Sequence, residues 1–147
     1  MDTGLPELMA GDLIFAKWKV HTEHVAMYVG GGLVVHAVPI RVGCVHLNRL
    51  EEHWVFKWFR GIGSIYRVSG ASDEERDRVV QYAINQVCKP FSLFSFKKFG
   101  FFWNCAKLVW RSWLEGTNGR IDLDQHSGIF VSAKDLMDSP YTYKITP

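Results

Sequence analysis

His24, His36 and Cys105 are the residues of this chain whose types and spacing best suit nucleophilic catalysis. A cysteine supplies a thiol, one imidazole can accept its proton, and a second imidazole can hold the first in a fixed orientation. The two histidines lie twelve residues apart, on either side of Gly30-Gly31-Gly32, in a segment whose pattern is typical of a β-hairpin. The sequence therefore predicts a cysteine nucleophile site in which both histidines precede the thiol.

Cys105 is the best placed of the three cysteines, because it falls at the start of a predicted helix from about Asn104 to Glu115. A helix start and a nearby imidazolium both stabilise a thiolate. The helix start supplies only about 0.3–1 kcal/mol of the roughly 2.7 kcal/mol that lowers a thiol pKa by about two, so a histidine must contribute the rest. Cys88 falls at the end of a predicted helix and Cys44 within a strand, so neither gains this stabilisation. The alternative is that Cys105 is simply packed in the core, as cysteines often are.

The hairpin predicts which histidine faces the thiol. A three-residue loop at Gly30–Gly32 places His36 opposite Ala26, with His24 two residues further along on the same face, roughly 7–8 Å away on the diagonal. We expect His24 to be the general base and His36 to hold its tautomer, although a slip of one residue would turn one ring away. The remaining histidines are interpreted as surface or structural residues: His21, His46, His53 and His126.

The strands and helices that must position these residues are predicted from hydrophobic periodicity and from turn and capping residues. The first half of the chain predicts closely spaced strands, typical of an antiparallel meander or a small barrel, at Asp12–Trp18, His24–Val29, Leu33–Val38, Val42–Leu47, Trp54–Phe59 and Ile62–Val68. The second half predicts a helix capped by Ser72 and ended by Lys89-Pro90, the cysteine helix stopped by Gly116, a short turn from Ser132 through Met137, and a strand at Tyr141–Ile145. Residues 1–147 are expected to form one α+β domain.

Composition narrows the class of protein. Hydrophobic residues make up 48% of the chain and charged residues 22%, which is globular, and a net charge of +2 does not favour nucleic acid. No apolar run is long enough to span a bilayer, and the first residues lack the pattern of an export signal, so a cytoplasmic location is expected. Three cysteines without a Cys-x-x-Cys pair indicate free thiols and no disulfide framework. No cofactor is expected.

Several segments resemble the permuted NlpC-type papain-like hydrolases, and among these the YiiX/YebB-like branch, to which lecithin retinol acyltransferase-like proteins are related. The resemblance rests on Gly11-Asp12-Leu13-Ile14, on His24 through Ala37, on Asn104-Cys105 and on the tail from Ile121 to Pro140, and it covers nearly the whole chain. It implies a papain-like α+β fold in which a small antiparallel barrel or meander packs against the cysteine-bearing helix. It also implies that His24 is the base, His36 the polar third residue and Cys105 the nucleophile.

The chain departs from this family in front of the cysteine. Family members often carry a Pro-Tyr-Asp-like stretch with a tyrosine close to the site, whereas this sequence reads Pro90-Phe91-Ser92. The tyrosine hydroxyl is therefore absent. The backbone N–H of Cys105 is the best remaining donor for an oxyanion.

The segment Phe91–Trp103 holds seven aromatic residues in thirteen, together with Lys97 and Lys98. This composition suits an acyl-chain groove or peripheral contact with a membrane, and the alternative is a core segment. As a hypothesis, part of it lines the substrate cleft and selects an apolar acyl group, through Phe91, Phe99, Phe102 and Trp103. Trp110 and Trp113 on the following helix are expected in the core.

The leading hypothesis is a cysteine hydrolase or acyltransferase that cleaves an amide or ester through a thioester acyl-enzyme. The substrate would be a small molecule, a peptide amide or a lipid acyl group. Two alternatives remain. One is a non-catalytic binding module on the same fold, and the other is a zinc site built from His21, His24, His36 and Cys105.

Overall fold

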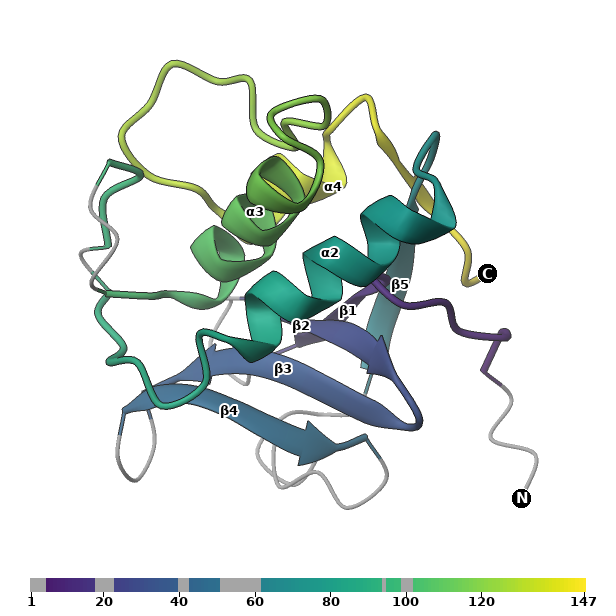
Figure 1. The fold of residues 1–147 in the computed structure, drawn as a ribbon, viewed down its shortest axis with the longest axis horizontal. Helices are drawn as coiled ribbons and strands as arrows, with labels where there is room; N and C mark the ends of the chain where they lie inside the picture. The colour runs from purple at the N-terminus through teal and green to yellow at the C-terminus, as the bar shows by residue number, and fades with distance from the viewer. Residues whose placement is uncertain (1–4, 18–22, 40–42, 51–61, 94, 99–101) are drawn as a thin grey trace.

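The computed structural model describes residues 5–17, 23–39, 43–50, 62–93, 95–98 and 102–147. The expected strand at Trp54–Phe59 lies outside these ranges, as do His21, His53 and Phe99. Within them, the strands form one layer and the helices cover one face of it (Figure 1). The site residues expected from the sequence, His24, His36 and Cys105, all lie inside the described ranges.

In the described ranges, six strands form one antiparallel sheet in the order β4-β3-β2-β1-β5-β6. Their bounds are β1 (Leu13–Lys17), β2 (Glu23–Gly30), β3 (Leu33–Val38), β4 (Cys44–Arg49), β5 (Ile62–Val68) and β6 (Thr142–Lys144). β1 to β4 follow one another as the expected meander. The sheet is open, so the alternative expectation of a closed barrel is wrong.

The edge of the sheet at β4 makes further backbone hydrogen bonds. The segment that follows the first helix hydrogen-bonds to the start of β4: Val45 N–H donates to the Lys89 carbonyl at 2.9 Å, and Phe91 N–H donates to the Gly43 carbonyl at 2.8 Å. These bonds cover part of the edge of the sheet.

The β2–β3 turn is tighter than expected. β2 ends at Gly30, which pairs with Leu33, so the turn is Gly31–Gly32 and not a three-residue loop. Both turn residues have positive φ, +59° and +77°, which glycine adopts without the steric penalty of a Cβ. A bulge between Tyr28 and Gly30 adds one residue to β2.

That bulge preserves the register on which the histidines depend. Beyond it, Met27 pairs with Val35, and the next pair along the same register brings Ala26 level with His36. His24 then lies two residues further on the same face, as the sequence predicted. The extra residue in β2 offsets the shorter turn, so the register is kept and both histidine rings stay on one face of the sheet.

Three helices are described, and each begins at the cap that the sequence predicted. They are α2 (Asp73–Ile84, N-cap Ser72 with a full capping box), α3 (Cys105–Gly116, N-cap Asn104) and α4 (Ala133–Met137, N-cap Ser132 with a capping box). α2 ends at Ile84, earlier than the expected stop at Lys89-Pro90. The chain leaves the helical path there and reaches Cys88, whose φ is +74° and whose N–H donates to the Val45 carbonyl on β4 at 2.9 Å.

The main core lies between the sheet and the helices. It joins alternate residues of β1 to β3 to the inner faces of α2 and α3 and includes Leu13, Phe15, Val25, Met27, Val35, Val79, Leu108 and Trp113. Trp110 and Trp113 are 6% and 0% exposed, which confirms their expected place in the core. A smaller cluster built on Ile14, Ala26, Val34 and Ile65 covers the other face of the sheet.

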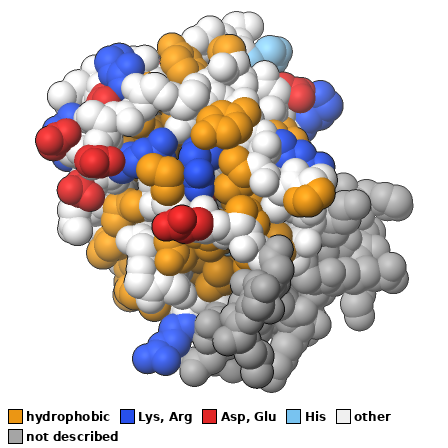
Figure 2. All heavy atoms as spheres, turned by 90° about the vertical axis from the view of Figure 1, so that its right-hand side faces the viewer, with side chains coloured by type: hydrophobic (Ala, Val, Ile, Leu, Met, Phe, Trp, Pro, Cys, Tyr) orange, Lys and Arg blue, Asp and Glu red, His pale blue; other side chains and the backbone are white. Residues whose placement is uncertain are grey.

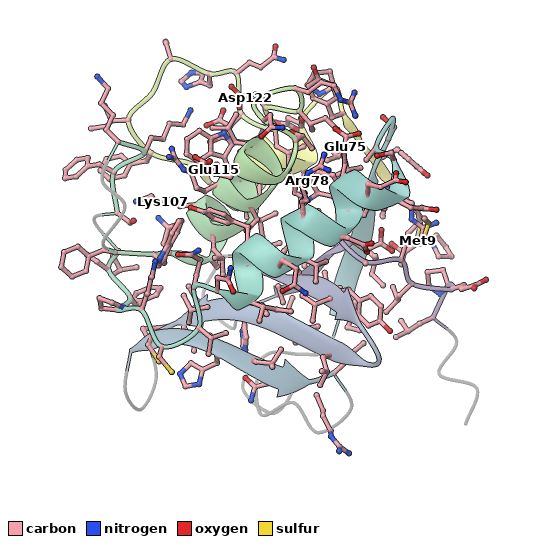
Figure 3. The ribbon with its side chains drawn as sticks, viewed as in Figure 1. Met9, Glu75, Arg78, Lys107, Glu115 and Asp122 are labelled. Atoms are coloured by element: carbon pink, nitrogen blue, oxygen red, sulfur yellow. The ribbon has the colours of Figure 1, made fainter. Side chains whose placement is uncertain are left out.

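Gly116 is the last residue of α3, and its role is close packing against α2. A Cβ at this position would lie 2.5 Å from Val79 Cγ2 and 2.6 Å from the backbone N and Cα of the same residue. The contact is reinforced by Arg78, which donates from Nε to the Gly116 carbonyl at 3.0 Å (Figure 3). α3 ends at Gly116, as the sequence predicted, and the missing Cβ also lets the two helices approach.

Gly116→Ala is therefore expected to lower the free energy of unfolding by about 1–3 kcal/mol, because backbone atoms cannot move aside as a side chain can. Urea denaturation followed by circular dichroism measures the change. Glu115→Ala is the matched control, since this exposed neighbour only forms an i,i+4 ion pair with Arg111 and should change stability by less than about 0.5 kcal/mol. Equal effects of the two variants would contradict the close-packing argument.

The surface carries mixed charge on the view in Figure 2, where basic, acidic and hydrophobic side chains are interspersed over the part that is described. Among the described helices, none has the length and hydropathy needed to cross a bilayer.

Candidate active site

Cys105 is the first residue of α3, as the Asn104 cap predicted. The Asn104 side chain accepts a hydrogen bond from the backbone N–H of Lys107 at 2.8 Å and so fixes the first turn. The thiol is thereby placed at the end of the helix that carries free N–H groups and the positive end of the dipole.

A buried lysine holds the segment that leads into α3. Lys107 lies near the helix start (Figure 3), where its Nζ donates to the Phe102 carbonyl at 3.0 Å and lies 5.0 Å from the centre of the Trp103 ring. Burial lowers the pKa of Lys107 to about 8, and the Arg111 guanidinium adds to this effect. These contacts fix the backbone immediately before Cys105.

A pocket of about 250 Å³ brings the predicted nucleophile and base together. His24 from β2 and Cys105 from α3 both line it. The remaining lining is largely apolar and consists of Ala37, Pro39, Phe91, Leu93, Asn104, Ala106, Val131, Ser132 and Ala133. The backbone N–H of Val25, the residue after His24, is close enough to the Cys105 sulfur to act to lower the pKa of the thiol. Thiol and imidazole therefore meet at one cavity although 81 positions separate them in the sequence.

His24 and His36 are in direct contact. His24 Nε2 lies 2.8 Å from His36 Nδ1, and the ring planes are inclined at 69°. His24 is 7% exposed and His36 is 0% exposed, so the contact is shielded from solvent. Nε2 of His24 is thus turned to His36, and this contact orients the His24 ring.

The structure adds two residues from β4 that the sequence did not single out. Asn48 Oδ1 lies 3.0 Å from His36 Nε2, which extends the chain of contacts from His24 to a third side chain. The His46 ring centre is 6.5 Å from that of His36. Cys44, His46 and Asn48 alternate along β4 and thus share one face. In the sequence, these alternating polar residues were the signal that could have identified Asn48 and His46 as neighbours of His36.

The other two cysteines lie outside the pocket lining. Cys44 is buried, its sulfur lies 3.3 Å from His46 Nε2, and burial together with nearby Cys88 raises the pKa of its thiol. Cys88 is exposed in the turns after α2. Neither has an arrangement like that of Cys105 beside His24.

The pKa of Cys105 differs from expectation. Burial raises the pKa of this thiol above its ordinary value, although N–H groups of Val25, Ala106 and Cys105 act to lower it. The helix start was expected to favour the thiolate, but loss of hydration outweighs the three donors. Burial therefore opposes formation of the thiolate at this position.

The chain is similar to known proteins both in sequence and in fold. The NlpC/P60 family model matches residues 4–63, a range that holds both histidines and Asn48 and ends before Cys105. Uncharacterized protein YycO from Bacillus subtilis (strain 168) is 27% identical over 130 residues, covering 83% of this chain and 48% of YycO. The crystal structure of metalloprotein YiiX from Escherichia coli O157:H7 superposes with a TM-score of 0.73 at 18% identity, covering 94% of this chain and 96% of YiiX.

The chain is thus similar to the NlpC/P60 family over residues 4–63, and it shares the fold of YiiX. Its mixed α/β fold is papain-like, with the histidine strands before the cysteine helix in the sequence. The chain spans about half the length of YycO, the curated relative that it matches.

The aromatic segment before the cysteine divides between pocket, surface and core. Phe91 and Leu93 line the pocket. Phe102 is 49% exposed and is not among the lining residues, and Trp103 is 1% exposed and packs edge-to-face on Tyr82. The expectation that Trp103 contacts substrate is therefore corrected. Its indole is buried in the core, with Lys107 Nζ packed over the ring. Phe99 lies outside the described residues.

The zinc alternative rests on residues that the structure places only in part. His24, His36 and Cys105 are described, whereas His21 is not. Within the described part of the chain, no group of three or more His, Cys, Asp or Glu side chains is arranged to hold a metal ion.

Proposed function

We propose that this protein is a cysteine hydrolase or acyltransferase that acts on an amide or ester. The NlpC/P60 match and the YiiX-like fold point to a hydrolase-type function in general. The observation that carries the finer proposal is the shared pocket of Cys105 and His24, with His36 bonded to the far nitrogen of His24.

The reaction begins with a proton transfer from the Cys105 thiol to His24. The sulfur attacks the substrate carbonyl, and the carbonyl oxygen becomes an oxyanion that accepts a hydrogen bond from the backbone N–H of Cys105 at the helix start. His24 gives its proton to the departing amine or alcohol, which leaves a thioester on Cys105. His24 then takes a proton from water or another acceptor, which displaces the sulfur and releases an acid or a transferred acyl product.

The lining of the pocket supports an apolar acyl group as the donor. Beyond the reacting residues, the walls are formed mainly by Ala, Val, Pro, Leu and Phe side chains, and no lysine or arginine lies among the lining residues of the described pocket. Such walls gain from apolar substrate surface and offer little to a charged side chain. Fatty amides and esters, or peptides with an apolar residue at the cleaved carbonyl, fit this lining.

Leu93→Ser is expected to raise the KM for long-chain acyl esters about tenfold relative to short-chain ones, because part of an apolar wall is removed. Steady-state rates over a series of acyl lengths measure the ratio. Phe102→Ser is the matched control, since Phe102 is exposed but does not line the pocket. Equal losses on short and long substrates would count against an apolar acyl pocket.

The test of the proposed function compares thiol alkylation with metal removal. Low concentrations of iodoacetamide should label Cys105 before Cys44 and Cys88 and abolish turnover of an activated ester. Treatment with 1,10-phenanthroline should leave turnover unchanged. Loss of activity with the chelator, together with stoichiometric zinc in protein purified without chelator, would favour the zinc site. A folded chain without selective labelling or turnover would favour the binding module.

A further inference from the structure

Asn48 is the residue behind the histidine pair, and its amide determines where the protons sit. We propose that Asn48 is a positioning residue that fixes the tautomers of His36 and His24, so that Nδ1 of His24 is the basic nitrogen at the pocket. This inference rests on the proposed function for its kinetic consequences, but the proton positions can be measured without any activity.

The first step is the contact between Asn48 and His36. An amide oxygen can only accept a hydrogen bond, so Oδ1 of Asn48 at 3.0 Å requires that His36 Nε2 carries a proton. A neutral imidazole has one N–H and one acceptor nitrogen. Nδ1 of His36 is then the acceptor.

The second step passes this choice to His24. Nε2 of His24 lies 2.8 Å from the acceptor nitrogen of His36, so His24 must donate from Nε2. The acceptor nitrogen of a neutral His24 is then Nδ1. Because His24 lines the pocket together with Cys105, we infer that this nitrogen is the one that takes the thiol proton.

Burial makes the arrangement depend on Asn48. His36 is 0% exposed, and water cannot readily take the place of the amide oxygen. The opposite amide orientation would present an NH₂ group to His36 and reverse every donor in the chain. His24 would then carry its proton on Nδ1 and could not accept one from the thiol.

The register of the sheet explains why Asn48 can reach His36. His36 pairs with His46, and Asn48, two residues further along β4, lies on the same face and diagonally across from His36. The titratable groups around the pair are His24 from β2, Cys105 from α3, and His46 with Cys44 from β4. β4 in turn is held by the segment after α2 through the Val45–Lys89 hydrogen bond.

The experiment reads the ring nitrogens directly. In protein labelled with ¹⁵N-histidine, two-bond ¹H–¹⁵N correlation spectra at a pH where both rings are neutral should show His24 and His36 as Nε2–H tautomers. Variants in which one histidine is replaced assign each signal to its ring. Asn48→Leu should disturb this pattern and lower kcat about tenfold with little change in KM, the effect of losing one buried orienting hydrogen bond.

Asn48→Asp separates positioning from mere structural support. The carboxylate still accepts from His36 Nε2, so the tautomers should persist, and its charge favours the protonated rings, so the pH–rate profile should move to higher pH by about one unit or more. Leu47→Thr, at an exposed neighbour on β4, is the control and should change neither the spectra nor the profile.

An Nδ1–H tautomer for His24 in the unsubstituted protein would overturn the inference, as would unchanged tautomers and kcat in a folded Asn48→Leu variant. If Asn48→Leu does not fold, the spectrum of the unsubstituted protein and the Asn48→Asp profile still decide. The expected tautomers in a chain without turnover would refute the proposed function and leave this inference intact. Active protein with the opposite tautomers would refute this inference and leave the proposed function intact.

Discussion

Cys105→Ala is expected to lower kcat/KM for an activated ester by about a thousandfold or more, to the level of uncatalysed hydrolysis in the presence of protein. The proposed mechanism forms its covalent intermediate on this sulfur, and no other thiol lines the pocket with His24. Alanine is a good helix former and keeps the start of α3, so the fold should persist. Rates measured beside circular dichroism spectra separate lost chemistry from lost structure.

Two further substitutions make the comparison specific to position. Cys88→Ser changes an exposed thiol and should leave the rate unchanged. Cys44→Ala removes a buried thiol that contacts His46, so a small change in rate is compatible with the proposal. If Cys105→Ala retained turnover, or if Cys88→Ser removed it, Cys105 would not be the nucleophile.

Local signals in the sequence were sufficient to predict the elements that carry the site. Asn104 followed by an apolar helical pattern predicted the start of α3, and Ser72 and Ser132 predicted the other two helix starts. Each of these caps acts through hydrogen bonds to residues three positions away, which is why a short window of sequence contains the information. The place of Cys105 on α3 followed from the same signal.

The register of the histidine hairpin was predicted for a reason that only partly held. A three-residue loop was expected from the sequence, whereas the structure has a two-residue turn at Gly31–Gly32 and a bulge in β2. The two arrangements give the same pairing beyond the turn, because what fixes the register is which faces of β2 and β3 are buried. Val25, Met27 and Val35 enter the main core together, and this holds His24 and His36 on their common side.

Features that depend on long-range contacts were missed. The contact of Asn48 with His36 requires the β3–β4 pairing, and the loop between these strands gave no turn signal that fixes it. The hydrogen bonds of residues 88–91 to the start of β4 could not be predicted without knowing where the chain goes after α2. Trp103 was assigned to the cleft from composition, but packing against Tyr82 decided its place.

The thiol pKa was also misjudged, since the sequence reveals the helix start but not the depth of the pocket. A helix N-terminus contributes at most about 1 kcal/mol at a surface site, while burial of a charge costs more. Under the proposed mechanism, His24 is therefore needed to form the thiolate, and not only to relay protons later in the reaction.

His24→Ala is therefore expected to have the second largest effect, lowering kcat/KM by about a thousandfold and also slowing alkylation of Cys105 at neutral pH. With His24 present, the thiol proton can pass to the imidazole within the pocket. Without it, ionisation must follow the thiol pKa, which burial holds above the ordinary value, so the pH at which alkylation becomes fast should rise.

Iodoacetamide labelling rates over a series of pH values measure this shift independently of any substrate. His126→Ala is the matched control, because the His126 ring is exposed and accepts only from the backbone N–H of Gly128 among its described hydrogen bonds. An unchanged labelling profile in folded His24→Ala would mean that the imidazole does not take the thiol proton. A shift in labelling without loss of turnover would place the general base elsewhere, so the two measurements together determine whether one ring performs both steps.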